Sequence, residues 1–187
     1  MIIRHAEKPA NEVKAQGVTA EGKASEGPLT VRGWQRAGAL AHLLAPSTGQ
    51  FAFPLLEKPS VIYASSPSGG SKRPLETIRP LAQKIGLDPV QTFTNGEEAD
   101  LVAAVRKERG VVLICWQHER IVGIATRLTE SGPPLPIPDS WPEDRFDMIW
   151  IFAASGGAVT HWEFAQVPQL LLAGDEPKPI ESSASAR

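Results

Sequence analysis

Val111-Val112-Leu113-Ile114-Cys115 is a continuous apolar run near the middle of the chain, bounded by Gly110 and by the polar segment 117–120. A strand that is apolar at every position is typical of the middle of a parallel sheet, where helices cover both faces. On either side of this run apolar residues recur at helical spacing, across 97–109 before it and across 121–128 after it. The centre of the chain therefore predicts a helix, a buried strand and a second helix.

The same alternation extends toward both ends of the chain. We expect further strands at Met1–Arg4, Val61–Ala64 and Pro89–Phe93, and helices across 30–44, with Thr30 as N-cap, and across 75–85. Apolar segments at 148–154 and 159–164 flank Ser155-Gly156-Gly157 and predict a hairpin. This pattern predicts an α/β fold. In detail we expect a three-layer sandwich with a mostly parallel central sheet, helices on both faces and a C-terminal antiparallel hairpin.

Length and composition limit the classes of function. The chain has 187 residues, which suits one domain, and we expect that domain to cover residues 1–173. Residues 174–187 are small, polar and proline-containing, so we expect a disordered tail there. The chain has 19 Lys and Arg against 21 Asp and Glu, and it lacks the basic surplus of a nucleic-acid-binding protein. No nucleic-acid partner is predicted.

The sequence also predicts the compartment. Its longest apolar runs, such as 148–154, are far shorter than the roughly 18 residues of a membrane span, so no membrane partner is expected. Cys115 is the single cysteine, which excludes an internal disulfide. No leader precedes the first motif at Arg4, so we expect a cytoplasmic protein, with a strand half or a leader upstream of Met1 left open.

Polar residues follow each predicted parallel strand. Arg4-His5-Ala6-Glu7-Lys8-Pro9 follows the first, a Ser/Gly turn leading to Lys72-Arg73 and Thr77 follows the second, and Gln117-His118-Glu119-Arg120 follows the third. Because the carboxyl ends of parallel strands lie at one edge of a sheet, we expect these segments to converge. The sequence therefore predicts a polar site that contains two imidazoles, several cations and carboxylates.

This set of side chains suits phosphoryl transfer. Guanidinium groups bind phosphate oxygens through paired N–H donors, and the first turn of a helix near Arg73 also favours an anion. A neutral imidazole is a competent nucleophile near neutral pH, and a protonated one stabilises the phosphoryl oxygens. A neighbouring carboxylic acid can protonate the leaving alcohol. The residues therefore predict metal-free phosphoryl transfer through a phosphohistidine.

No cofactor and no metal site are predicted. A Gly-x-Gly-x-x-Gly sequence does not follow any predicted strand, so a dinucleotide has no binding motif. His42 and His161 each lack a second His at the spacing of a zinc site. The expected partner is instead a phosphorylated small molecule or a phosphoprotein.

Four motifs follow one another along the chain, and their order resembles that of the histidine phosphatase (phosphoglycerate mutase-like) superfamily. The resemblance covers roughly residues 1–164 and implies the three-layer fold of that family. The motifs that carry it are Arg4-His5-Ala6-Glu7-Lys8-Pro9, Leu29-Thr30-Val31-Arg32-Gly33, Ser71-Lys72-Arg73-Pro74-Leu75-Glu76-Thr77 and, after the strand at 111–115, His118.

The resemblance also implies roles for individual residues. His5 stands at the position of the nucleophile, and Arg4, Arg73 and His118 complete the phosphate pocket. Lys8 stands where the acid-phosphatase and phytase branch has a further phosphate-binding Arg, and Glu119 stands where that branch has its proton donor. The short chain is instead typical of the mutase-like branch, whose donor lies between the second Arg and the late His, where Glu97 and Glu98 fall. We favour Glu119.

Three departures from the family pattern bear on the activity. Ala6 replaces the commoner Gly, and the turn from Ser66-Pro67 to Arg73 is longer than usual. Residues that hold the second phosphate of a true mutase are not recognisable. We therefore predict a phosphomonoester hydrolase. A phosphoglycerate mutase, a phosphohistidine-protein phosphatase, and a phosphate- or phosphoprotein-binding module with little turnover are the alternatives.

Overall fold

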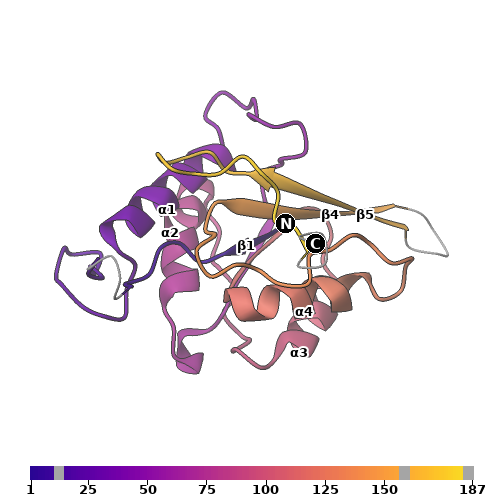
Figure 1. Cartoon of the computed structure of the whole chain (residues 1–187), viewed down its shortest axis with the longest axis horizontal. Helices are drawn as coiled ribbons and strands as arrows, with labels where there is room; N and C mark the ends of the chain where they lie inside the picture. Colours follow the sequence, from indigo (N-terminus) through magenta and orange to yellow (C-terminus); the bar gives the residue numbers. More distant parts are fainter. Residues whose placement is uncertain (11–14, 156–160, 183–187) are drawn as a thin grey trace.

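The described part of the chain has a mixed α/β fold built on one open, five-stranded sheet (Figure 1). The structure is a computed structural model that describes residues 1–10, 15–155 and 161–182. The strands run in the order β2-β3-β1-β4-β5, so β1 is central. Strands β1, β2 and β3 are parallel, β4 is antiparallel to β1, and β5 is antiparallel to β4. Their bounds are β1 Ile2–Arg4, β2 Val61–Ala64, β3 Val112–Trp116, β4 Met148–Ser155 and β5 His161–Pro168.

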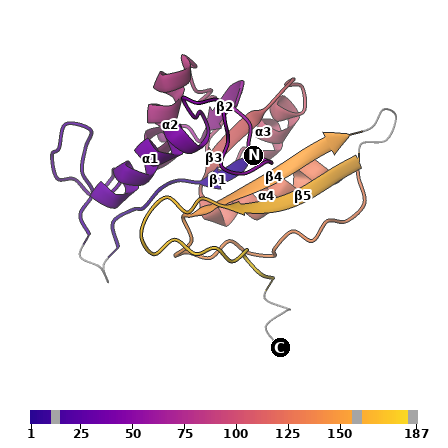
Figure 2. The same ribbon diagram turned by 90° about the horizontal axis from the view of Figure 1, so that it is seen from above.

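Four α-helices flank this sheet in the described residues, α1 Val31–Leu43, α2 Arg73–Ile85, α3 Glu98–Val105 and α4 His118–Thr129. Figure 2 shows α1 and α2 packed together on one side of the sheet and α3 and α4 on the other. None of the helices in the described residues is both long and apolar enough to span a membrane.

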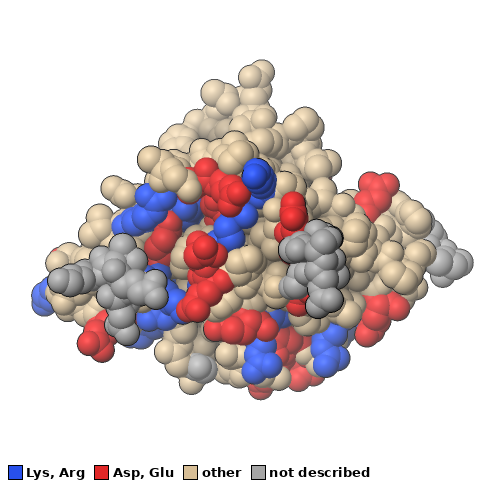
Figure 3. All heavy atoms as spheres, in the orientation of Figure 1, with Lys and Arg blue, Asp and Glu red and all other residues tan. Residues whose placement is uncertain are grey.

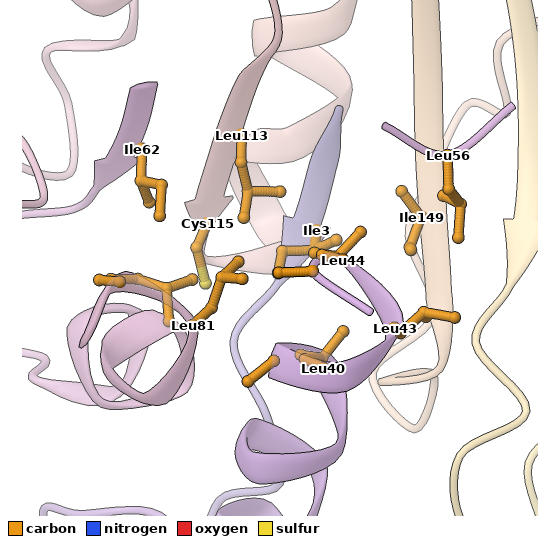
Figure 4. Close-up of a cluster of buried hydrophobic side chains, with 14 of the residues drawn as sticks. Ile3, Leu40, Leu43, Leu44, Leu56, Ile62, Leu81, Leu113, Cys115 and Ile149 are labelled. Carbon is orange, nitrogen blue, oxygen red and sulfur yellow. The ribbon is translucent and has the colours of Figure 1, made fainter. Parts of the chain in front are cut away.

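Two apolar clusters, one on each face of the sheet, hold these helices in place. Successive residues of one strand belong to opposite clusters: Ile3 and Cys115 pack with α1 and α2, whereas Ile2 and Trp116 pack with α3 and α4. Figure 4 shows the first cluster, in which leucines of α1 and Leu81 of α2 point at the strands. This alternation explains why the strands are apolar at every position, because both of their faces are buried.

Some elements are shorter or longer than the sequence predicts. Helix α3 ends at Val105 rather than at Arg109, because residues 106–109 are all charged and offer no apolar side chain to the core. Pro89–Phe93 does not form a strand, although Val90 makes an isolated bridge to Tyr63 of β2. The two strands of the hairpin, β4 and β5, extend beyond the expected bounds. The predicted turn of the hairpin at Gly156-Gly157 lies outside the described residues.

Residues 174–182 of the predicted tail contact the rest of the domain in the structure. Asp175 accepts hydrogen bonds from Arg36 of α1, and Ile180 is buried, with its backbone N–H and carbonyl bonded to the side-chain amide of Gln166 on β5. This segment of small and polar residues therefore contains two side chains that pack against the domain, Asp175 and Ile180. Residues 183–187 lie outside the described part of the chain.

Candidate functional site

The segments that follow β1, β2 and β3 lie at one edge of the sheet. The backbone N–H of His5 donates to the Trp116 carbonyl at 3.1 Å, and the N–H of Ser65 donates to the Cys115 carbonyl at 3.3 Å. These two bonds extend the parallel pairing by one residue beyond β1 and β2. The residues after all three strands therefore begin side by side, as expected for the carboxyl edge of a parallel sheet.

Helices from both faces of the sheet begin at this edge. Helix α4 starts at His118, directly after β3, and α2 starts at Arg73. Thr77 connects α2 to the segment after β1, because its hydroxyl accepts from the Ala6 N–H at 2.8 Å and donates to the Arg73 carbonyl at 2.7 Å. The Arg4-His5 segment therefore lies between the first turns of α2 and α4.

The start of α1 supports the same segment from a third side. Thr30 caps this helix by accepting from the Gly33 N–H at 3.1 Å, and its own backbone N–H donates to the Glu7 carbonyl at 2.9 Å. A Cβ atom on Gly33 would lie 2.6 Å from that carbonyl oxygen. The Leu29–Gly33 motif therefore has a packing role, since only glycine lets α1 approach the chain after His5 so closely.

Arg4 is a buried cation whose guanidinium has few partners. Its side chain is 1% exposed and its Cζ lies 3.8 Å from the centre of the Phe146 ring. Nη1 donates to the backbone carbonyls of Pro142, Glu143 and Arg145, whereas Nε and Nη2 have no hydrogen-bond partner. Burial lowers the pKa of Arg4 to about 10, so the group remains a cation at neutral pH.

Unpartnered polar atoms gather at this edge of the sheet. Six buried side-chain nitrogen or oxygen atoms in the described residues lack a hydrogen-bond partner, and four of them belong to Arg4, Arg73 and His118. A fifth is Oε1 of Gln117, whose Nε2 donates to Ser65. Buried polar atoms are nearly always paired in folded proteins, so such a concentration marks a place prepared for a polar ligand.

His5 lies among these groups as a neutral imidazole. Its side chain is 3% exposed, and Nδ1 lies 2.8 Å from the Ala6 carbonyl oxygen, so we assign the proton to Nδ1 and a free lone pair to Nε2. Burial lowers the pKa of His5 to about 3, and the positive charges of Arg4, Arg73 and Lys8 contribute to the decrease. The ring is therefore uncharged at neutral pH, with one nitrogen available as a nucleophile.

His118 faces the same charges from α4. Burial lowers its pKa and the positive charge of Arg4 lowers it further, while the carboxylate of Glu119 has the opposite effect. Glu119 Oε2 lies 3.1 Å from His118 Nδ1, without the alignment of a hydrogen bond. The carboxylate of Glu119 is 61% exposed and therefore open to exchange protons with water.

The structure gives Glu97 and Glu98 other partners. Glu97 accepts from the backbone N–H and the hydroxyl of Thr94, and these bonds lower its pKa. Glu98 is buried and accepts from the indole of Trp116 at 3.1 Å. Both carboxylates are thus engaged in the packing of α3 and of the loop before it.

A groove of about 920 Å³ does not have His5 or Arg4 in its lining but is bordered by Phe146, which neighbours both residues. Phe146 forms a wall that both share, since its ring contacts Arg4 and its centre lies 6.3 Å from that of His5. Lys8 and Glu143, an ion pair at 3.0 Å, also line the groove. On the face shown in Figure 3, Lys and Arg side chains are interspersed with Asp and Glu side chains rather than forming a surface of one sign.

A second charged cluster borders the groove, and sequence reasoning missed it. Arg36 of α1 is 2% exposed and pairs with Glu7 at 2.8 Å and with Asp175 at 2.7 Å. A signal for it exists in the sequence, because Arg36 falls at the same helical spacing as the buried Gly33, Ala37 and Leu40. The loop 142–146, which supplies the carbonyls around Arg4, has no such signal.

Comparison with known proteins finds no family model that matches the chain and no curated protein that matches it. The likeness to histidine phosphatases rests on the sequence motifs alone. Within residues 1–10, 15–155 and 161–182, no group of three or more His, Cys, Asp or Glu side chains is arranged to hold a metal ion.

Proposed function

We propose that this protein is a metal-independent phosphomonoester hydrolase of the histidine phosphatase type, acting through a phosphohistidine on His5. The observation that carries the proposal is the pair of arginines, Arg4 and Arg73, whose guanidinium groups keep buried nitrogens without a hydrogen-bond partner and whose charges act on a neutral His5. A phosphoryl group has the charge and the acceptor oxygens to satisfy these donors. Hydrogen bonds between guanidinium groups and phosphate are short, charge-assisted and strong in a site with little water.

The proposed reaction has two steps. Nε2 of His5 attacks phosphorus, the bond from phosphorus to the ester oxygen breaks, and a carboxylic acid protonates the departing alcohol. Water then attacks the phosphohistidine, the same carboxylate accepts its proton, and inorganic phosphate leaves with His5 restored. Arg4, Arg73 and His118 hold the three phosphoryl oxygens in both steps, and the sequence favours Glu119 as the proton donor.

The arrangement of the fold supports the proposal. A central sheet with helix pairs on both faces is what a phosphoglycerate mutase-like, three-layer sandwich requires. In such α/β sheets ligands bind at the carboxyl edge of the strands, and the segments that carry Arg4, Arg73 and His118 begin at that edge. The finer assignment to that fold remains part of the proposal.

The groove favours a hydrolase over a mutase. A mutase holds a second phosphate and needs cations that are free to bind it. Among the described residues the cations lining the groove are Lys8, Arg32 and Arg36, and each is paired with a carboxylate, Lys8 with Glu143 and the two arginines with Glu7 and Asp175. A second anionic group would have to break these pairs.

The proposal is tested by comparing His5→Ala with His42→Ala, which alters an exposed histidine of α1. We expect the His5 variant to release no phosphate from p-nitrophenyl phosphate, with an unchanged far-UV circular dichroism spectrum, and the His42 variant to match the unaltered protein. Phosphate release by His5→Ala would exclude the phosphohistidine. Vanadate binding without turnover in the unaltered protein would favour the binding module. Interconversion of phosphoglycerates with a bisphosphate primer would favour the mutase.

A further inference from the structure

The groove and the phosphate pocket meet along a short line of residues. Phe146 and the backbone of Glu143 contact Arg4, and Lys8 follows His5 by three positions. All three residues also line the groove. An ester bound with its phosphoryl group at Arg4 and His5 therefore has this groove as the adjacent space for its alcohol part.

Two exposed carboxylates are candidates for the acid, but only one of them borders that space. Glu119, on α4, lies against the His118 ring and does not line the groove. Glu143 lines the groove, and its negative charge acts on the pKa values of both Arg4 and His118. A proton donor has to reach the ester oxygen, which lies between phosphorus and the alcohol, so the position of Glu143 suits this role better.

We infer, resting on the phosphatase function proposed above, that the groove holds the alcohol part of the substrate and that Glu143 is the catalytic acid that protonates its ester oxygen. Lys8 holds the Glu143 carboxylate in the resting protein, at 3.0 Å. When the phosphoryl dianion binds, it attracts Lys8, and Glu143 takes a proton from water, to which its side chain is 74% exposed.

The proton balance of the two steps is complete with Glu143 alone. Its acid proton passes to the ester oxygen as that oxygen leaves phosphorus and His5 Nε2 binds it, and the alcohol departs into the groove. Glu143, now a carboxylate, accepts a proton from the water that attacks the phosphohistidine. In the resting state the hydrogen bond and charge of Lys8, together with the charges of His118 and Arg4, lower the pKa of Glu143, and the negative charge of a bound phosphoryl group opposes this effect.

The lining of the groove also indicates the chemical class of the alcohol. Its cations are paired with carboxylates, as described above, so an anionic alcohol finds no free partner among the described lining residues. Val31 is 60% exposed at its edge and Phe146 forms its wall. These features favour phosphomonoesters of uncharged alcohols that are poor leaving groups and need protonation.

The test compares two uncharged leaving groups of similar size, in benzyl phosphate and in p-nitrophenyl phosphate. Benzyl alcohol leaves only when protonated, whereas p-nitrophenolate leaves without help. We expect Glu143→Gln to lower kcat/KM for benzyl phosphate by about 100-fold and that for p-nitrophenyl phosphate by less than about 10-fold. Glu163→Gln, which removes an exposed carboxylate from β5, is the matched control and should change neither value.

Glu119→Gln decides between the two acids. We expect it to affect both substrates equally, because Glu119 contacts His118 rather than the leaving group. A selective loss on benzyl phosphate in Glu119→Gln, or an equal or absent effect in Glu143→Gln, overturns the inference while His5-dependent hydrolysis leaves the proposed function standing. If His5→Ala still hydrolyses both esters, the proposed function itself fails, whatever the Glu143 result.

Discussion

Arg4 and Arg36 are both buried arginines, 1% and 2% exposed, yet their surroundings differ completely. All three guanidinium nitrogens of Arg36 donate to side-chain oxygens, those of Glu7, Gln169 and Asp175. Within the described part of the chain Arg4 forms no ion pair with a carboxylate, and two of its nitrogens have no hydrogen-bond partner. One arginine is neutralised by the protein itself, and the other keeps its charge available.

The pKa values of the two arginines move in opposite directions for this reason. Burial disfavours the charged form of both groups. For Arg36 the hydrogen bonds to Asp175 and Glu7 outweigh burial, and the pKa rises above its ordinary value. For Arg4 burial dominates, and the pKa decreases. A buried cation that has only backbone carbonyls and an aromatic ring as partners is costly to fold, which favours a binding role for Arg4.

Replacing each arginine by methionine separates these roles. Arg36→Met leaves the buried carboxylates of Glu7 and Asp175 with only the half-exposed Arg32 as a cationic partner, and we expect the free energy of unfolding to decrease by about 3 kcal/mol. Arg4→Met should affect stability less but weaken vanadate binding by about 100-fold, since two charge-assisted donors are lost. Urea unfolding and vanadate inhibition measure the two effects. Equal loss of vanadate binding in both variants would contradict the comparison.

The next largest effect concerns the close approach of Gly33 on α1 to the backbone of Glu7, which brings Glu7 next to Arg36. Gly33→Ala places a methyl group 2.6 Å from the Glu7 carbonyl oxygen, and we expect a loss of about 2–3 kcal/mol in the free energy of unfolding. Gly38→Ala, in the same helix with nothing within 4 Å, is the matched control and should stabilise α1 by about 0.5–1 kcal/mol. Similar values for the two variants would show that α1 can move away from Glu7 at little cost.

A smaller effect is expected at Thr77, which holds α2 and Arg73 next to the segment after β1. Thr77→Ala leaves the buried Ala6 N–H without its acceptor and should lower the free energy of unfolding by about 1–2 kcal/mol. Thr77→Ser keeps the hydroxyl and should retain most of the stability. If serine is no better than alanine, the methyl group of Thr77 rather than its hydrogen bonds stabilises this contact.

The sequence predicts the features of the fold that depend on the local spacing of apolar residues, namely the strands, the helices and the residues at their ends. Strand and helix periodicity placed Arg4, Arg73 and His118 at the ends of elements, and parallel pairing is sufficient to bring such ends to one edge. The sequence pattern does not predict contacts that a side chain makes with backbone atoms of a distant loop. Arg4 is held by three carbonyls of the loop 142–146, and a carbonyl is present at every residue, so no side-chain pattern records it.

The charged cluster around Arg36 was missed for a related reason. Its three members come from the segment after β1, from α1 and from residue 175, in a tail whose composition resembles disorder. Pairs so far apart in sequence have no fixed spacing. The role proposed for Glu143 has no sequence signal either, because this residue follows a proline-rich stretch, whereas Glu119 stands directly next to a predicted histidine.

Per pH unit, the smallest expected effect is the pH dependence of stability due to His5. Burial and nearby cations lower its pKa to about 3 in the folded protein, below an ordinary value of about 6.5. Between these values the unfolded chain binds a proton that the folded protein does not. The stabilising contribution is therefore complete above about pH 6.5 and is lost as the pH falls toward 3. We expect a loss of about 1 kcal/mol per pH unit in this range.

His5→Asn provides the control, since its amide can still donate to the Ala6 carbonyl but does not titrate. Urea unfolding of both proteins from pH 6.5 to 5 isolates the histidine, because most carboxylates remain ionised there. As the pH falls, the unaltered protein should lose about 1 kcal/mol of unfolding free energy per pH unit relative to the His5→Asn variant. Parallel curves would mean that His5 is protonated in the folded protein, and a protonated imidazole has no lone pair with which to attack phosphorus.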